Sequence, residues 1–123
     1  MLDNIFYERS NKVNIPAKTI YSNPLYIKRF LSKFDIIKDS SISEGNFEIY
    51  DMCIDIELAL EMLHLNKLQK QRLELWRLGY KEIEISQKLG ITRIAVHRSI
   101  VGVCTKVSKQ LTGGISIWFI RLS

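Results

Sequence analysis

The clearest pattern in the chain is an apolar stripe toward its C-terminal end. Five aliphatic residues recur there at spacings of three and four: Val96, Ile100, Val103, Val107 and Leu111. This spacing returns every member to one side of an α-helix. Thr92 is a residue type that caps helix N-termini, and Gly113-Gly114 stops a helix. The pattern therefore predicts a long amphipathic helix from about Thr92 to Leu111.

A shorter helix is predicted just before it, from Lys81 to Leu89. Gly90 follows this helix directly, and glycine readily adopts the left-handed backbone conformation of a tight turn after a helix. Ser86, four residues before the glycine, is small enough to let a second helix cross closely. Apolar residues flank the turn at Ile85, Leu89 and Ile91. Together these features predict a helix-turn-helix over about Tyr80 to Leu111.

Two further helices are predicted upstream. Asn66 with Gln69 three residues later has the pattern of a capping box, and Gly79 ends the helix that they begin. Apolar residues recur at helical spacing from about Phe47 to His64: Ile49, Cys53, Ile56, Leu60 and Leu63. The opposite face of that helix is acidic, with Asp51, Asp55 and Glu61. We expect this face to be solvated, to keep the element away from DNA, or to receive a basic partner.

The N-terminal third contains one well-marked helix start. Asn23 is a good cap, and Pro24 at the first helical position lacks the N–H that would go unpaired, so a helix is predicted over residues 25–34. Its apolar stripe includes Leu25, with Lys28 outward. The polar run DSSISEGN at 39–46 is predicted to be a loop or hinge. Residues 1–22 are interpreted as an irregular arm or a short leading helix.

The expected fold is therefore all-α, a helical bundle in three parts. Residues 1–45 are expected to form an irregular, partly helical N-terminal arm, residues 46–112 a helix-turn-helix domain, and residues 113–123 a short apolar tail. The tail contains Ile115, Ile117, Trp118, Phe119 and Ile120. Such a run is costly to leave in water, so it is expected either to mediate a homodimer or to fold back onto the monomer core.

Charge is distributed unevenly along the chain. Residues 1–64 carry seven Lys or Arg against ten Asp or Glu, whereas residues 65–111 carry ten against three. No acidic residue follows Glu84. A polyanion such as nucleic acid neutralises many such charges at once, so double-stranded DNA is the expected partner of the basic half. The alternative is a basic face that is merely solvated.

In a helix-turn-helix the second helix lies in the major groove, and its first turns meet the base edges. Arginine pairs well with guanine, and an outward aliphatic side chain suits a thymine methyl group. The expected base contacts are Thr92, Arg93, Ile94, His97, Arg98 and Val101. The expected phosphate contacts are Lys81, Lys88, Thr105, Lys106 and Lys109. For each arginine taken alone, a solvated charge is the competing interpretation.

Other chemistry is not indicated. Neither histidine has a second ligand residue at metal-binding spacing, and no Ser/His/Asp or Cys/His set suggests catalysis, so no metal, cofactor or enzymatic role is expected. Cys53 and Cys104 lie in apolar surroundings without a CxxC spacing and are expected to be buried, reduced thiols. The chain has no transmembrane-length apolar run and no signal-peptide pattern, so a cytoplasmic protein without membrane contact is expected.

The stretch from Leu65 to Leu111 resembles region four of bacterial sigma factors. The matching positions are Leu65, Asn66, Gln69, Gly79, Glu84-Ile85-Ser86, Leu89-Gly90-Ile91-Thr92 and Val96. The preceding segment MCIDIELALEMLHL is similar to the lead-in of small phage-encoded proteins that carry a region-four-like domain alone. Two departures are visible: Ser86 stands where that family has alanine, and the second helix is rich in outward apolar residues.

The resemblance implies promoter-type DNA recognition and raises RNA polymerase as a second candidate partner. The chain has no room for the region that reads the downstream promoter element, so a self-sufficient sigma factor is not expected. The leading hypothesis is a sequence-specific DNA-binding transcription regulator encoded by a phage or mobile element. The alternatives are a DNA-packaging subunit resembling a small terminase, and a polymerase- or sigma-binding protein that has lost DNA contact.

Overall fold

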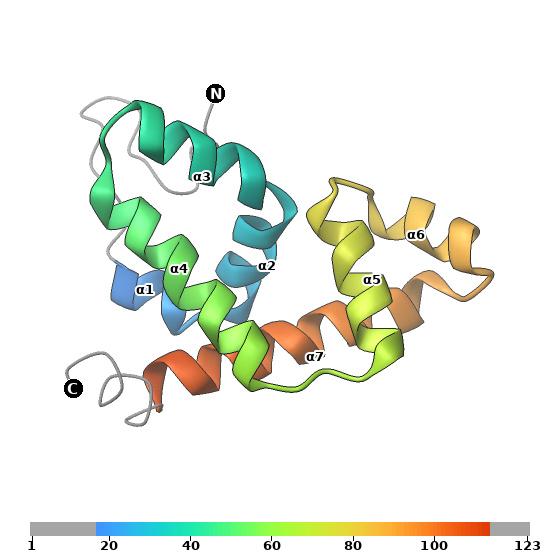
Figure 1. Ribbon diagram of the computed structural model, residues 1–123. Helices are drawn as coiled ribbons and strands as arrows, with labels where there is room; N and C mark the ends of the chain where they lie inside the picture. Colours follow the sequence, from blue (N-terminus) through green and yellow to red (C-terminus); the bar gives the residue numbers. More distant parts are fainter. Residues whose placement is uncertain (1–16, 114–123) are drawn as a thin grey trace.

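The computed structural model describes residues 17–113, and this part of the chain is all-α, without strands. Figure 1 shows the arrangement of the helices. They are α1 (Ala17–Tyr21), α2 (Pro24–Ser32), α3 (Phe34–Ser43), α4 (Phe47–Met62), α5 (Lys67–Arg77), α6 (Glu82–Leu89) and α7 (Arg93–Thr112). The predicted all-α class is confirmed.

The longest helix, α7, is the element on which the others assemble. Helices α1, α2, α4, α5 and α6 all pack against it, and α4 and α5 meet it at successive positions along its length (Figure 1). Its inward face consists of the five residues of the predicted stripe, all of which are buried: Val96, Ile100, Val103, Val107 and Leu111. The predicted long amphipathic helix is therefore confirmed.

The described N-terminal helices share one core with α7. Ile27, Phe30 and Leu31 of α2 are fully buried and belong to the same apolar cluster as the inward face of α7. A hydrogen bond extends this contact, since the buried Ser108 hydroxyl donates to the Tyr21 carbonyl at 2.6 Å. Helix α4 begins at the expected position, with Asn46 as its N-cap.

The N-termini of α2 and α5 lie where the local signals placed them. The Asn23 side chain accepts the Leu25 amide, and Pro24 occupies the first turn of α2. Asn66 and Gln69 form a reciprocal capping box at the start of α5, with distances of 2.8 and 3.1 Å. These N-termini are well predicted because a cap depends on residues two or three positions apart, not on the fold.

Two predictions for the region of α2 and α3 were wrong. The helix predicted over 25–34 ends at Ser32, and a new helix begins at Phe34 in a different direction. The loop predicted over 39–46 is helical as far as Ser43, so that only residues 44–46 form the turn. Packing of α3 on α4 overrides the polar sequence, because it buries Ile37 and Ser41, and the Ser41 hydroxyl is satisfied by the Lys38 carbonyl at 2.6 Å.

Three side chains also differ from their expected exposure. Leu25 is exposed, whereas Lys28 is largely buried in an ion pair. Asp55 was expected on the solvated face of α4 but is buried, and the Tyr21 hydroxyl donates to its Oδ2 at 2.6 Å. A buried carboxylate needs such a partner because leaving it unpaired away from water is costly.

Residues 17–21 form the short leading helix that was one of two interpretations of the N-terminal segment. The expectations for residues 1–16 and for the apolar tail over residues 114–123 lie outside the described residues. Among residues 17–113, no helix combines the length and apolar character required to span a membrane.

Candidate nucleic-acid interface

A tight turn joins α6 to α7. Gly90 ends α6 with a φ of +66°, in the left-handed region that glycine adopts at low cost. The Ile91 amide then donates back to the Ser86 carbonyl at 3.1 Å. Ser86 is buried, and its hydroxyl is satisfied by the Ile83 carbonyl at 2.7 Å, so the small polar residue fits where alanine was expected. The predicted roles of Gly90 and Ser86 in the turn are confirmed.

The N-terminus of α7 projects from this turn. Thr92 is the exposed N-cap, and its hydroxyl oxygen accepts the Ala95 amide at 3.1 Å. Beyond it, an outward stripe runs along α7 opposite the buried face, with Ile94 at 58% exposure followed by the exposed Arg98. Val101 and Thr105 continue this stripe and are half-buried. The Thr105 hydroxyl donates to the Val101 carbonyl at 2.8 Å.

The outward stripe carries the basic residues Arg98 and Lys109, and Lys106 lies on its flank. Arg98, Lys106 and Lys109 are exposed, and none of them forms an ion pair within the described part of the chain. No carboxylate is available on α7 itself, because no acid follows Glu84 in the sequence. These cations are therefore available to an external anion.

Two of the predicted base-contacting residues lie on a flank of α7 and face Glu82. The carboxylate of Glu82, at the start of α6, lies 2.7 Å from His97 Nδ1 and 3.5 Å from Arg93 Nη1. It also pairs with Lys28 Nζ of α2 at 2.8 Å. The side chain of Glu82 is only 13% exposed, while that of Arg93 is 59% exposed. Arg93 thus has a partner but keeps most of its surface in water.

The surroundings of Glu82 decide its charge. Burial alone would raise the pKa of the Glu82 carboxyl, but the hydrogen bonds from Lys28 and His97 outweigh burial and hold the pKa below its usual value. The carboxylate is therefore ionised at neutral pH. It offsets positive charge on this flank of α7 and leaves the outward stripe as the most basic part of the helix.

The remaining predicted phosphate contacts lie near the turn. Lys81 is exposed at the start of α6. Lys88 is exposed near the end of α6, with its Nζ 4.8 Å from the centroid of the Tyr80 ring. Lys106 and Lys109, by contrast, lie in the C-terminal half of α7.

Lys28 and Trp76 are parts of this region that the sequence did not reveal. The Trp76 indole N–H donates to the Lys28 carbonyl at 2.8 Å, and Lys28 Nζ lies 5.0 Å from the centroid of the Trp76 ring. A further hydrogen bond runs from the Arg72 guanidinium of α5 to the Ser99 hydroxyl of α7. The Trp76 contacts join α5 to α2, and the Arg72 contact joins α5 to α7. No local pattern marks them, because they join residues distant in the sequence.

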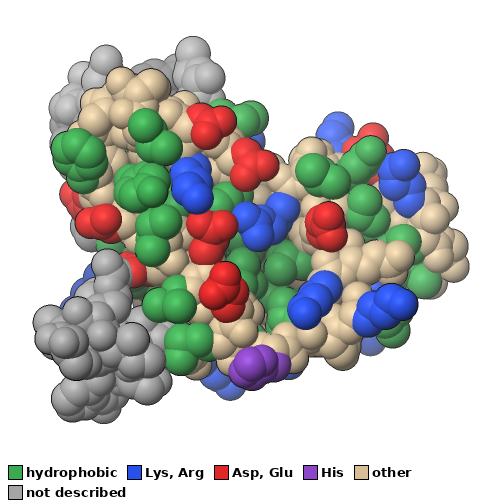
Figure 2. All heavy atoms as spheres, viewed as in Figure 1, with side chains coloured by type: hydrophobic (Ala, Val, Ile, Leu, Met, Phe, Trp, Pro, Cys, Tyr) green, Lys and Arg blue, Asp and Glu red, His purple; other side chains and the backbone are tan. Residues whose placement is uncertain are grey.

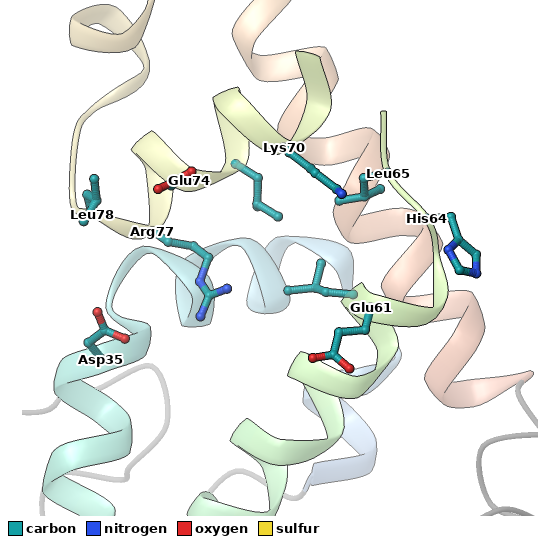
Figure 3. Close-up of a pocket in the computed structure, with 10 residues that line it drawn as sticks. Asp35, Glu61, His64, Leu65, Lys70, Glu74, Arg77 and Leu78 are labelled. Atoms are coloured by element: carbon teal, nitrogen blue, oxygen red, sulfur yellow. The ribbon is translucent and has the colours of Figure 1, made fainter. Parts of the chain in front are cut away.

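A groove of about 610 Å³ lies elsewhere, between α4 and α5 (Figure 3). Lys70 and Arg77 of α5 and Glu61 of α4 project around it, and the His64 ring points away from the other lining side chains. Both signs of charge line this groove, so it does not attract one kind of ion. Among residues 17–113 no three His, Cys, Asp or Glu side chains are placed to share a metal ion.

The face in Figure 2 shows the same division of charge on the molecular surface. Acidic side chains gather on the lobe that contains α3 and α4, whereas Lys and Arg are the more frequent charges on the lobe that contains α5 and α6. The uneven charge along the sequence thus becomes a separation in space. A polyanion would approach the second lobe and α7 with less repulsion.

No protein-family model, curated protein or solved structure matches the chain.

Proposed function

We propose that the chain binds double-stranded DNA in a sequence-specific manner as a transcription regulator. In this proposal α6, the turn and α7 act as a helix-turn-helix of the type found in sigma region four, with the N-terminal half of α7 in the major groove. Ile94, Arg98 and Val101 contact base edges, and Lys81, Lys88, Lys106 and Lys109 contact phosphates.

The observation that carries this proposal is the outward stripe of α7. It begins at a tight turn, it presents Ile94 and Arg98 to solvent, and its cations have no carboxylate partner in the described part of the chain. An arginine whose guanidinium N–H groups are unpaired can donate two hydrogen bonds to a guanine edge. An exposed isoleucine beside it can pack against a thymine methyl group.

The Glu82 contacts refine the proposed reading surface. His97 is engaged by Glu82 through Nδ1, so it can reach a base only with Nε2. Arg93 reaches a base or a phosphate only by exchanging its 3.5 Å ion pair for the new contact. Arg98 makes no such exchange, and it is therefore the central reading residue in this proposal.

Salt dependence is the direct test of phosphate contact. The full chain is titrated onto a pool of random-sequence duplexes at increasing salt, and the affinity should fall linearly on a log–log scale. Lys106→Ala and Lys109→Ala should each reduce the slope by about 1, because each removes one neutralised phosphate. Lys70→Ala, which removes an exposed lysine at the groove between α4 and α5, is the matched control and should leave the slope unchanged. Absence of binding at low salt would refute the proposal.

RNA polymerase is a second proposed partner, and it rests on the resemblance to region four alone. Its test is retention of purified polymerase by the immobilised chain in the absence of DNA. Retention that survives Arg98→Ala would place the polymerase contact outside the reading surface.

A further inference from the structure

The outer face of α4 carries an exposed stripe that combines apolar and acidic residues. Phe47 is 72% exposed, which is unusual for a phenylalanine, and Ile54 lies seven residues further on at 37% exposure. Between them Asp51 is exposed, and Glu61 is exposed one further heptad along. Seven residues span about 10 Å of helix and two turns, so the four side chains lie along one side of α4.

The outer face of α7 repeats this spacing with the opposite charge. Ile94 and Val101 are also seven residues apart, and Arg98 lies between them at the position that Asp51 occupies in α4. Four residues separate Phe47 from Asp51, and four separate Ile94 from Arg98. Glu61 lies ten residues beyond Asp51 and Lys109 eleven residues beyond Arg98, so a second pair of opposite charges falls within one residue of the same register. The two stripes are therefore complementary in both apolar spacing and charge.

The two stripes cannot meet within one molecule. Helix α4 turns its opposite face inward, where Met52, Cys53 and Ile56 are buried, and α7 likewise buries Val96 and Ile100. The helices already pack on each other through these inner sides. Each outer stripe therefore faces away from the core that residues 17–113 share.

We propose that the α4 stripe is a docking surface for the α7 stripe of a second copy of this chain. Phe47 and Ile54 would pack against Ile94 and Val101 of the partner copy, with Asp51 facing the partner's Arg98. The occupant is identified by charge complementarity and by the matching seven-residue spacing. The contact is heterologous, so each copy still offers one free stripe, and association continues into a chain or closes into a ring.

This association has a consequence for DNA binding, and that consequence rests on the proposed function. The α7 stripe cannot hold the partner copy's α4 and a DNA groove at once. DNA and self-association therefore compete for the same residues, and the acidic stripe of one copy takes the place of the polyanion on the α7 stripe of another. The self-association itself does not depend on the proposed function.

Charge reversal on each stripe provides the test. Sedimentation of the full chain at low salt and increasing protein concentration is measured for the unmodified protein, for Asp51→Arg and for Arg98→Asp. Each reversal places like charges together and should weaken self-association by roughly tenfold. Mixing the two variants restores an opposite-charge pair at every contact and should restore association. Asp39→Arg on α3 makes the same change in net charge as Asp51→Arg, but away from the stripe, and should have little effect on self-association.

Three outcomes would overturn the proposal. The first is a protein that stays monomeric at low salt over the whole concentration range. The second is self-association that both reversals leave unchanged, or that Trp118→Ser with Phe119→Ser abolishes while the reversals do not. The third is a mixture of the two reversed variants that fails to associate although both variants are folded by circular dichroism. Asp51→Arg should still bind DNA, so failure of this proposal is distinguishable from failure of DNA binding.

Discussion

Lys28 Nζ and Glu82 Oε2 lie 2.8 Å apart, and this ion pair joins α2 to α6, the helix before α7. Both side chains are largely buried, with 14% and 13% of their surfaces exposed. The same carboxylate contacts His97 and Arg93 at the start of α7. One acidic residue therefore links α2, α6 and α7.

Removal of the lysine charge should destabilise the fold. Lys28→Met keeps the aliphatic stem and removes the ammonium group that pairs with Glu82, so the free energy of unfolding should fall by about 1–3 kcal/mol. Urea denaturation followed by far-UV circular dichroism measures the change. Lys38→Met is the matched control, because Lys38 pairs with Glu57 at 3.0 Å in a more exposed setting and should cost about 1 kcal/mol or less. Equal losses for both variants would contradict a special role for the Lys28–Glu82 pair.

Glu82 should also make stability depend on pH in the acid range. Its pKa is lower in the folded state than the ordinary value of 4.5, so folding favours the ionised form. The resulting stabilisation is complete above about pH 4.5 and is lost as the pH falls through the folded-state pKa. Glu82→Gln cannot ionise, so its stability should fall less steeply below that pH. Parallel curves for the two proteins would show that the carboxylate is not responsible.

The turn before α7 should depend on glycine at position 90. Gly90 has a φ of +66°, and a side chain in that region is strained even though open space surrounds the position. Gly90→Ala should therefore destabilise the protein by about 1 kcal/mol. Gly102 lies within α7 and has open space where a methyl side chain would point, so Gly102→Ala should stabilise by about 0.5–1 kcal/mol. Thermal unfolding of both variants gives the comparison, and the same sign for both would refute the assignment of these roles.

The two thiols should be unreactive while the protein is folded. Burial raises the pKa of Cys53 and of Cys104 to about 12, so almost no thiolate is present at pH 8. Alkylation by iodoacetamide, measured by mass spectrometry, should be negligible in buffer and complete in denaturant. Fast modification of either residue in the folded protein would show that its site opens readily.

Local signals in the sequence predicted the parts of the fold that depend on near neighbours. The caps at Asn23, Asn66 and Thr92 and the turn at Gly90 depend on backbone groups within a few residues. Helical spacing alone also identified the buried face of α7. These features depend on local backbone geometry and on the 3.6-residue repeat of the α-helix, so they do not depend on which tertiary contacts the fold makes.

Features that depend on packing between distant segments could not be predicted in this way. Glu82 and Glu84 are similar acids two residues apart in the sequence, and only the position of α2 decides that Glu82 is the one that pairs with Lys28. The sequence likewise predicts Asp55 on the solvated face of α4, because its hydrogen-bond partner Tyr21 lies on another helix. The sequence therefore predicted the candidate residues of α7, including Arg93 and His97, but not the contacts that Glu82 and Lys28 make on this flank.

We propose that Arg98 reads a base from the outward stripe of α7. Duplexes selected by the full chain from a random pool are compared with those selected by Arg98→Ala and by the control Lys70→Ala. Arg98→Ala should lose preference at one base pair, at a cost of about 1–3 kcal/mol for the preferred sequence, while Lys70→Ala selects the same site. An identical site and affinity for Arg98→Ala would contradict the claim.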